Sequence, residues 1–309
     1  MNILGLSDQL ENVLVEACKT LYAEAATTDL LDFPDYANVG DSAIFLGEMA
    51  LFSKLDVKVE SVQSVNSLTW NFGEMSDFVT FQGGGNLGGL YPTFDAYRMM
   101  VIDKLPKSSS VVVMPQSVGL NDQEIFSHYR NITAGKRVSF MARDFNTKKI
   151  LDSHRLNNVL APDAVHCLGF IESQPSTQKF LVLKRTDAES QAGHFKNNDV
   201  VDWLGDDFAC NVKTKLRHIS RLSTRTSKMF RFTPESAQAL AASRLQRGVN
   251  LLSKGEIIVT DRLHAMLIGL QMGRQVVAID NAYKKLSTYA DTWGLMKLEN
   301  LEFRNSFEN

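Results

Sequence analysis

The sequence predicts an α/β protein with two doubly wound parallel sheets, on three observations. Short apolar runs rich in β-branched residues alternate with segments of helical periodicity along the chain. Loops that combine glycine with polar residues follow several of these runs. The chain has 309 residues, enough for two domains of about 150 residues each. Repeated strand, loop and helix units favour parallel sheets covered by helices on both faces.

In the first half, expected strands and helices alternate. The first element is an amphipathic helix over residues 7–26, because Leu10, Leu14 and Leu21 fall on one face. Expected strands, each a short β-branched or aromatic run, cover residues 30–33, 57–62, 77–81, 110–114 and 138–141. Further helices, each preceded by turn or capping residues, are expected over residues 42–54, 93–104, 124–133 and 144–153.

A polar stretch over residues 169–178 is the expected linker between domains at residues 1–172 and 173–309. Residues 188–231 are weakly patterned and are expected to contain loops. Strands are expected over residues 179–183, 256–259 and 275–279. Helices are expected over residues 234–253, over 284–293 and between the last two strands, and Pro234 suits a helix start.

Composition excludes several classes of function. The chain is 44% hydrophobic and 22% charged, which is ordinary for a soluble protein with a full core. A formal net charge of -2 gives no field that favours nucleic acid, so no such partner is expected. The basic run over residues 213–231 is expected to be a solvated face; contact with anionic lipid head groups or a diphosphate is the alternative.

The sequence shows neither a signal peptide nor an apolar segment of about 20 residues. We therefore expect a cytoplasmic protein, and peripheral contact with the inner membrane stays open. Cys18, Cys167 and Cys210 are widely spaced and odd in number, so reduced and mostly buried thiols are expected. Neither the cysteines nor the histidines have metal-ligand spacing, and no metal is expected.

The most informative segment begins where an apolar run ends at Thr260 and Asp261. A helix-like segment follows, with Arg262, Leu263 and His264 at its start. A fixed cation and a titratable imidazole beside free backbone N–H groups suit a small anion such as phosphate or carboxylate. The alternative is a structural pair, in which Arg262 bridges Asp261 or a carbonyl group.

Residues 82–89 contain five glycines in eight positions, which lets backbone amides face a ligand. Gly84, Gly85 and Asn86 are therefore candidate binding residues, and a flexible turn is the alternative. The segment lacks the lysine of a Walker A loop.

Asp41 opens an expected helix just after Gly40. It is either the helix N-cap, with Ser42 as the other candidate, or a residue that acts as a base or orients a sugar hydroxyl while Gly40 permits close approach of a ligand.

Polar residues follow three more expected strands. Gln116 and Ser117 either hydrogen-bond a ligand or satisfy their own loop. Arg143 is free to point into a cleft if Asp144 caps the next helix; a surface ion pair is the alternative. Arg185 carries the same ambiguity after the first strand of the second half. Because loops at the carboxyl ends of parallel strands converge, we expect one shared cleft.

Five segments, taken together, resemble the polysaccharide pyruvyl transferase family. They are Asn38-Val39-Gly40-Asp41-Ser42-Ala43-Ile44, Gln82-Gly83-Gly84-Gly85-Asn86, Pro115-Gln116-Ser117, Arg143-Asp144 and Thr260-Asp261-Arg262-Leu263-His264. They occur in the family's order. The resemblance implies a GT-B-like fold, with two Rossmann-like domains that face a central cleft. It places the acceptor on residues 1–172 and phosphoenolpyruvate on residues 173–309.

The resemblance also implies a function. The pyruvyl group of phosphoenolpyruvate would move to a sugar of a polysaccharide, or of its lipid-linked precursor, as a cyclic ketal, with release of phosphate, in exopolysaccharide or cell-surface glycan biosynthesis. It associates Arg262, Leu263 and His264 with phosphoenolpyruvate, and it matches a further family arginine to Arg143 or, second, to Arg185.

The implied chemistry fits the residue types. Arginine side chains and helix N-termini suit a carboxylate and a phosphate. His264 is the expected general acid, because imidazole titrates near neutrality, and Asp41 is the expected base. Phosphoenolpyruvate is a co-substrate, and no metal or organic cofactor is expected.

Two alternatives stay open. A GT-B glycosyltransferase would share the fold and would use Arg262 to bind the diphosphate of a nucleotide sugar. An inactive scaffold of a polysaccharide assembly complex would bind no anion at all.

Overall fold

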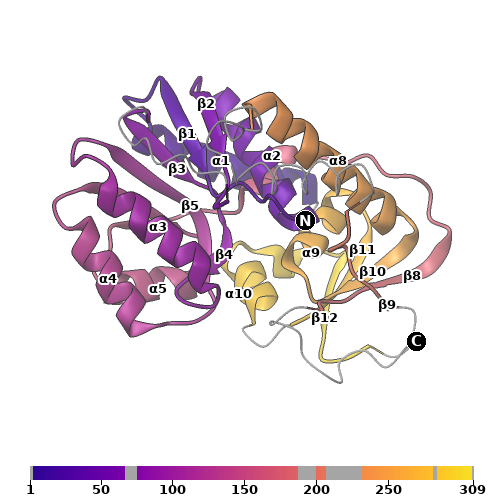
Figure 1. Cartoon of the computed structure of the whole chain (residues 1–309). Coiled ribbons are helices and arrows are strands. Elements are labelled where there is room, and N and C mark those ends of the chain that lie inside the picture. The colour runs from indigo at the N-terminus through magenta and orange to yellow at the C-terminus, as the bar shows by residue number, and fades with distance from the viewer. Residues whose placement is uncertain (1–2, 67–74, 187–199, 207–231, 281–283, 308–309) are drawn as a thin grey trace.

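The computed structural model describes residues 3–66, 75–186, 200–206, 232–280 and 284–307, and its strands form two parallel sheets (Figure 1). The seven strands of the first sheet are β1 (Thr27–Leu31), β2 (Lys58–Gln63), β3 (Phe78–Phe81), β4 (Gly84–Leu87), β5 (Ser110–Val118), β6 (Arg137–Ala142) and β7 (Asn158–Leu160). Their order is β2-β1-β3-β5-β6-β7, and β4 pairs with the far end of β5.

The second sheet has five strands and lies C-terminal to the first. They are β8 (Gln178–Leu183), β9 (Val200–Val201), β10 (Gly255–Thr260), β11 (Gln275–Ile279) and β12 (Leu301–Arg304). Their order is β12-β11-β10-β8-β9, with every pair parallel. The expected α/β architecture with parallel sheets is confirmed.

Helices connect most of these strands. They are α1 (Ile3–Leu21), α2 (Val39–Lys54), α3 (Pro92–Lys104), α4 (Gln123–Thr133), α5 (Phe145–Ser153), α8 (Pro234–Ser253), α9 (Leu263–Gln271) and α10 (Lys285–Thr292), with short 3-10 turns η2 (Ala164–Leu168) and η4 (Leu295–Lys297). Each helix expected from the sequence is present, with its ends moved by a few residues.

The first sheet is covered on both faces because its strands are apolar on both sides. On β5, Val112 and Met114 pack into a cluster with residues of α1, α2 and α8. Val111 and Val113 point the other way, into a cluster with residues of α3, α4 and α5. This alternation is what a fully buried parallel strand requires. Figure 1 shows α3, α4 and α5 on the side of this sheet away from α1, α2 and α8.

Helices α1, α2 and α8 each contribute residues to the core clusters of both sheets. Leu6 and Leu10 of α1 pack into the cluster of the second sheet, whereas Leu14 packs against the first. Helix α8 lies close against α2 because residue 248 is glycine; a Cβ there would come within 2.3 Å of a Val39 methyl group. The expected domain boundary at residues 172–173 and the GT-B arrangement of two separate domains stay predictions.

Strand β5 continues four residues beyond the expected end at Met114 and therefore includes Gln116 and Ser117. The short strands β4, β7, β9 and β12 were not expected, because two to four residues give too little periodicity to detect. The basic run at 213–231 lies outside the described residues, as does most of the weakly patterned segment 188–231.

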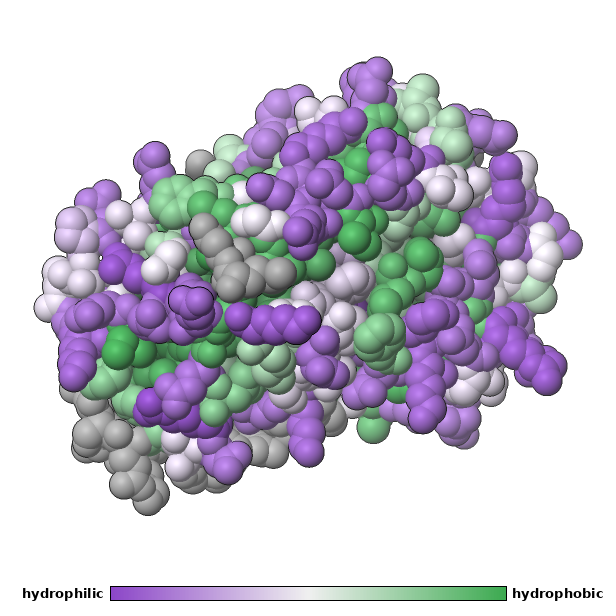
Figure 2. Space-filling view, turned by 180° about the vertical axis from the view of Figure 1, so that it is seen from behind, coloured by the Kyte–Doolittle hydropathy of each residue, from purple (hydrophilic) through white to green (hydrophobic). Residues whose placement is uncertain are grey.

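Within the described residues, no helix is both long enough and apolar enough to cross a membrane. Figure 2 shows hydrophilic side chains over much of the face behind that of Figure 1, with hydrophobic side chains between them.

A buried hydrogen-bonded chain joins the N-terminal and C-terminal helices. The hydroxyl of Tyr289 on α10 accepts from the backbone N–H of Asp163 at 3.0 Å and donates to Nε2 of His166 at 2.9 Å. Nδ1 of His166 then donates to the hydroxyl of Ser7 on α1 at 3.2 Å. We assign the ring proton to Nδ1 because the Tyr289 hydroxyl, which already accepts one hydrogen bond, can then donate to Nε2. Burial lowers the pKa of His166 from 6.5 to about 4, so the imidazole is neutral near pH 7.

The pKa of His166 predicts a loss of stability in mild acid. Its folded-state pKa lies below its unfolded value, so the unfolded chain binds the proton more readily. Stability is therefore complete above pH 6.5 and falls by up to about 3 kcal/mol as the pH drops to about 4. Urea titrations at a series of pH values should show a shallower fall for His166→Gln than for the wild type. His128→Gln, at an exposed histidine of α4, should keep the wild-type slope; equal slopes in all three proteins would contradict this role of His166.

Candidate active site

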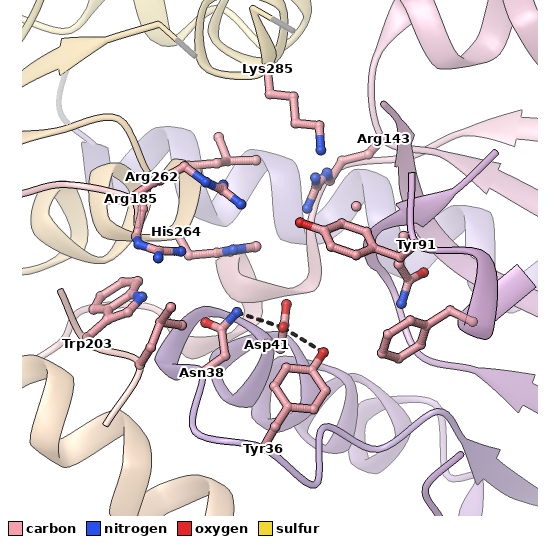
Figure 3. Close-up of a pocket in the computed structure, with 15 residues that line it drawn as sticks. Tyr36, Asn38, Asp41, Tyr91, Arg143, Arg185, Trp203, Arg262, His264 and Lys285 are labelled. Atoms are coloured by element: carbon pink, nitrogen blue, oxygen red, sulfur yellow. Dashed lines mark hydrogen bonds between the residues drawn. The ribbon is translucent and has the colours of Figure 1, made fainter. Parts of the chain in front are cut away.

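A cavity of about 330 Å³ opens where the loops after strands of both sheets meet (Figure 3). Its walls come from segments that follow β1, β4, β6, β8, β9, β10 and β11, and from β4 itself. The expected convergence of these loops is therefore present. The cavity is lined by most of the candidate residues, namely Asp41, Gly85, Asn86, Arg143, Arg185, Arg262, Leu263 and His264. Gly84, Gln116 and Ser117 are not among the lining residues.

Helix α9 points its N-terminus at the cavity. Arg262 is the N-cap residue, and its backbone N–H donates to the hydroxyl of Thr260 at 3.0 Å. The side chain of Leu263 is buried in the core of the second sheet and fixes the first turn. No described residue accepts from the N–H groups of Leu263, His264 or Ala265. A helix end of this kind is suited to bind an anion.

The guanidinium group of Arg262 is held by a carboxylate. Its Nη2 lies 2.7 Å from Oδ2 of Asp202, and the Arg262 side chain is 4% exposed. The ion pair is with Asp202 and not with Asp261. Asp202 also accepts from the N–H and hydroxyl groups of Thr186, while Oδ1 of Asp261 accepts from the N–H of Arg185 at 2.8 Å. Two aspartates thus fix the two segments that carry Arg185 and Arg262.

The central group of the site is Asp163, which lies between β7 and η2. Its Oδ2 accepts from Nη1 of Arg143 at 2.8 Å and from Nε2 of His264 at 3.0 Å. Its Oδ1 accepts from the N–H of Val165 at 2.9 Å. Burial alone would raise the pKa of Asp163, but attraction and hydrogen bonding from His264, together with the charge of Arg143, hold it well below its usual range. The carboxylate therefore stays charged and orients both side chains.

A second hydrogen bond, to Ser117, also fixes the orientation of Arg143. Its Nε donates to the hydroxyl of Ser117 at 3.0 Å, and that hydroxyl donates to Asp144 at 2.5 Å. Asp144 is the N-cap of α5 and accepts from the N–H of Thr147 at 2.8 Å. The expected capping role of Asp144 is confirmed. The alternative of a surface ion pair is wrong, because Arg143 is 2% exposed.

The glycine-rich segment brings two cations together. A Cβ on Gly85 would lie 3.2 Å from Nζ of Lys285 and 3.6 Å from Nη2 of Arg143, so both groups reach the cavity wall at this glycine. The buried side chain of Gln116 fixes this segment through two hydrogen bonds. Its amide donates to the carbonyl of Gln82 at 2.9 Å and accepts from the N–H of Asn86 at 3.2 Å.

Asn86 has a fixed orientation. The fully buried Arg98 donates from Nη2 to the amide oxygen of Asn86 at 2.8 Å and to Oδ2 of Asp32 at 2.9 Å. The amide oxygen of Asn86 is thus engaged inside the protein. A ligand in the cavity would meet its NH₂ group, which is a donor and suits an oxygen-rich ligand.

Asp41 lies across the cavity from Arg262 and Lys285, in the first turn of α2. The N-cap of α2 is Asn38, whose Oδ1 accepts from the N–H of Gly40 at 2.9 Å, so the interpretation of Asp41 or Ser42 as the N-cap is wrong. Oδ2 of Asp41 instead accepts from the hydroxyl of Tyr36 and from Nδ2 of Asn38, each at 2.8 Å (dashed lines in Figure 3).

Gly40 lets α2 approach the imidazole of His264. A Cβ at residue 40 would lie 2.8 Å from Nδ1, 2.9 Å from Cβ and 3.0 Å from Cγ of His264. Because Nε2 is engaged by Asp163, Nδ1 is the remaining ring nitrogen of His264.

The electrostatics of the lining residues favour an anion. Arg143, Arg185, Arg262 and Lys285 are cations, and Asp41 is the one carboxylate among the described residues that line the cavity. In Figure 3 the cations and His264 lie across the cavity from Tyr36, Asn38 and Asp41. Among the residues that the structure describes, no group of histidine, cysteine, aspartate or glutamate could hold a metal ion.

Several site residues were not predicted from the sequence. Asp163 follows the short apolar run Val159-Leu160-Ala161, and a strand assigned there would have placed it at the carboxyl edge of the sheet. Lys285 is the second of two lysines at a helix start, a pattern more typical of a surface. Asp202 lies in the weakly patterned segment, where the sequence carries no signal.

Comparison with known proteins finds sequence similarity over most of the chain. Pyruvyl transferase 1 of Schizosaccharomyces pombe is 26% identical over 302 residues, covering 91% of this chain and 73% of that protein. A putative pyruvyl transferase, EpsO of Bacillus subtilis, is 27% identical over 282 residues, covering 85% and 84%. A functionally uncharacterized protein from Klebsiella pneumoniae, solved by crystallography, shares the fold, with a TM-score of 0.66, 16% identity and coverage of 96% and 99%.

A family model described as polysaccharide pyruvyl transferase matches residues 38–283. That range begins at the Asn38 cap of α2 and includes Asp163 and the Arg262 to His264 segment. Since the match covers far more than half of the sequence, the chain belongs to the polysaccharide pyruvyl transferase family.

Proposed function

We propose that this protein transfers the pyruvyl group of phosphoenolpyruvate to a sugar, forms a cyclic ketal and releases phosphate. The observation that carries the proposal is the set of cations around one cavity, with Arg143 and His264 held by the same atom of Asp163. Membership of the family and the names of the two relatives, which describe them as pyruvyl transferases, support transfer of a pyruvyl group.

Phosphoenolpyruvate suits the cationic wall because it carries two anionic groups. Its phosphate has about −1.5 to −2 charges near neutral pH, and its carboxylate adds one more. The cations also occur as two groups, Arg143 with Lys285 at Gly85 and Arg185 with Arg262 near the N-terminus of α9. Two separated positive regions can hold the two anionic ends of one small molecule.

The reaction needs an acid, a base and two hydroxyl groups. A proton from His264 adds to C3 of the enol, which makes C2 electrophilic. Because Nε2 donates to Asp163, we assign this proton to Nδ1. A sugar hydroxyl oxygen bonds to C2 and gives its proton to Asp41. The bond from C2 to the phosphate oxygen breaks, and a second sugar hydroxyl bonds to C2 to close the ketal.

The protons balance over the whole cycle. Two hydroxyl protons leave the sugar; one restores the acid that protonated C3, and the other leaves with phosphate. No step of this proposed reaction requires an oxidant, a metal or an organic cofactor. The attachment of the acceptor to a lipid carrier, and a role in exopolysaccharide synthesis at the membrane, stay predictions.

Phosphoenolpyruvate should stabilise the protein against heat. At 100 times its dissociation constant, a ligand adds about 2.7 kcal/mol to the free energy of unfolding. Arg262→Ala should lose most of this shift, because a hydrogen bond to a charged group contributes about 1.5–3 kcal/mol. Differential scanning fluorimetry with phosphoenolpyruvate and a panel of nucleotide sugars measures both effects.

The matched control is Arg304→Ala, which removes an exposed arginine of β12 that pairs with Glu302 outside the cavity. It should keep the full phosphoenolpyruvate shift. A shift with a nucleotide sugar and none with phosphoenolpyruvate would overturn the proposal in favour of a glycosyltransferase. Absence of a shift with every anion would favour the scaffold alternative.

Gly40→Ala should impair turnover through His264. Alanine favours a helix by up to about 1 kcal/mol over glycine, so backbone propensity alone would stabilise this variant. A Cβ within 3.0 Å of three His264 atoms must instead displace the imidazole. Misplacement of a catalytic group by about 1 Å costs about 100-fold in rate. The measurement is release of phosphate from phosphoenolpyruvate, with p-nitrophenyl hexosides as acceptors.

The control for Gly40→Ala is Gly5→Ala, because a Cβ at this exposed position of α1 meets nothing within 4 Å. It should be as active as the wild type. If Gly40→Ala also kept full activity, the position of the His264 imidazole beside α2 would have no part in catalysis.

A further inference from the structure

Three aromatic rings in contact with one another line the cavity, from Tyr36 beside Asp41 to Tyr91, which Figure 3 shows near Arg143. Tyr36, Tyr91 and Phe94 all line the cavity, and none of them belongs to the hydrophobic clusters that form the core. Tyr36 comes from the loop after β1, and the other two lie at the start of α3. Three large rings that face a cavity and leave the core to other residues favour a ligand with an apolar face.

Neighbouring rings of this group meet at near right angles. The Tyr36 and Phe94 ring centroids are 6.2 Å apart with an interplanar angle of 76°, and those of Tyr91 and Phe94 are 6.5 Å apart at 84°. Both contacts are edge-to-face, so the rings do not stack on one another. Tyr36 is 38% exposed, and Tyr91 and Phe94 are half-buried.

A fixed carboxylate stands beside these rings. The hydroxyl of Tyr36 and Nδ2 of Asn38 both donate to Oδ2 of Asp41. No described residue donates to Oδ1 of Asp41, although the residue lines the cavity. The two donors therefore fix the orientation of the carboxylate and leave one oxygen to accept a hydrogen bond from a ligand. Figure 3 shows Tyr36, Asn38 and Asp41 together on the wall that faces His264.

We propose that Tyr36, Tyr91 and Phe94 form the acceptor subsite, where one uncharged hexose residue packs its C–H face on the rings and donates a hydroxyl to Oδ1 of Asp41. The proposal rests on the proposed function, which assigns the cationic side chains of the cavity to phosphoenolpyruvate. A hexose combines an apolar face of ring hydrogens with an edge of hydroxyl groups, which matches rings beside a carboxylate. An acceptor with its own carboxylate would be repelled by Asp41.

The subsite also fits the chemistry of the ketal. Both new bonds go to C2 of the donor, so the acceptor must present two hydroxyls close enough to bridge one carbon. Asp41 accepts the proton of the hydroxyl that attacks first, as the balanced reaction requires. The cavity of about 330 Å³ lies at the small end of ligand pockets, which favours a single terminal sugar residue beside the donor.

The test separates acceptor from donor kinetics in the full chain. The acceptors are p-nitrophenyl glycosides of galactose, glucose, mannose and glucuronic acid, and phosphate release is measured as each substrate is varied. Phe94→Ala should raise KM for the best hexoside about tenfold, in the range of one lost aromatic contact. It should leave KM for phosphoenolpyruvate and the thermal shift with phosphoenolpyruvate unchanged. Phe145→Ala, at a 56% exposed phenylalanine outside the cavity, is the matched control and should change neither KM.

Two further variants divide the roles within the subsite. Asp41→Asn keeps the shape of the side chain but is a poor base, so it should lower kcat more than it raises KM for the hexoside. Tyr36→Phe keeps the ring and removes one donor to Asp41, and it should be impaired less than Asp41→Asn. The glucuronide should be the poorest acceptor of the panel.

Several outcomes would overturn the subsite. A rise in KM for phosphoenolpyruvate in Phe94→Ala would assign the rings to the donor, and unchanged kinetics for all substrates would remove them from the site. A nucleotide-sugar thermal shift that Phe94→Ala abolishes would mean that the rings stack a base. A wild type that binds phosphoenolpyruvate but transfers to no hexoside would contradict the acceptor class alone. A wild type without a phosphoenolpyruvate shift would instead contradict the proposed function.

Discussion

The site depends on one buried carboxylate that two hydrogen-bond donors share. Oδ2 of Asp163 accepts from both Arg143 and His264, which come from the loops after β6 and β10. One atom therefore ties the carboxyl edges of the two sheets together. Attraction from His264 and Arg143 outweighs the burial that would otherwise raise the pKa of Asp163. Because the charge is kept, both side chains keep their orientation without a ligand.

Hydrogen bonds and ion pairs with neighbouring side chains also position other residues that line the cavity. Asp202 holds Arg262, Arg98 holds Asn86, and the donors Tyr36 and Asn38 hold Asp41. In each case a neighbouring side chain fixes the orientation of the group that lines the cavity. Such preorganisation lowers the cost of orienting groups when substrate binds. The cations suit the donor, and Asp41 with the ring of Tyr36 suits a sugar.

The sequence predicted the parallel α/β architecture and most of the helices, because strong periodicity and capping residues are local signals. It also predicted Arg143, Arg262 and His264 as neighbours, since loops after parallel strands meet. It could not predict Asp163 as their common partner, because β7 is only three residues long and gives no detectable pattern. The cap of α2 was misassigned because Asn38 and Asp41 are both good capping residues, and only the backbone geometry separates them.

The most direct test of this account is the affinity of Asp163→Asn for phosphoenolpyruvate, measured by titration calorimetry. If Asp163 only contributed charge, its removal would strengthen binding of an anion. If it positions Arg143 and His264, as we infer, affinity should fall by about tenfold or more, which is at least about 1.4 kcal/mol. Asp152→Asn, at an exposed residue of α5, should change affinity little. Tighter or unchanged binding by Asp163→Asn would contradict the central role of Asp163.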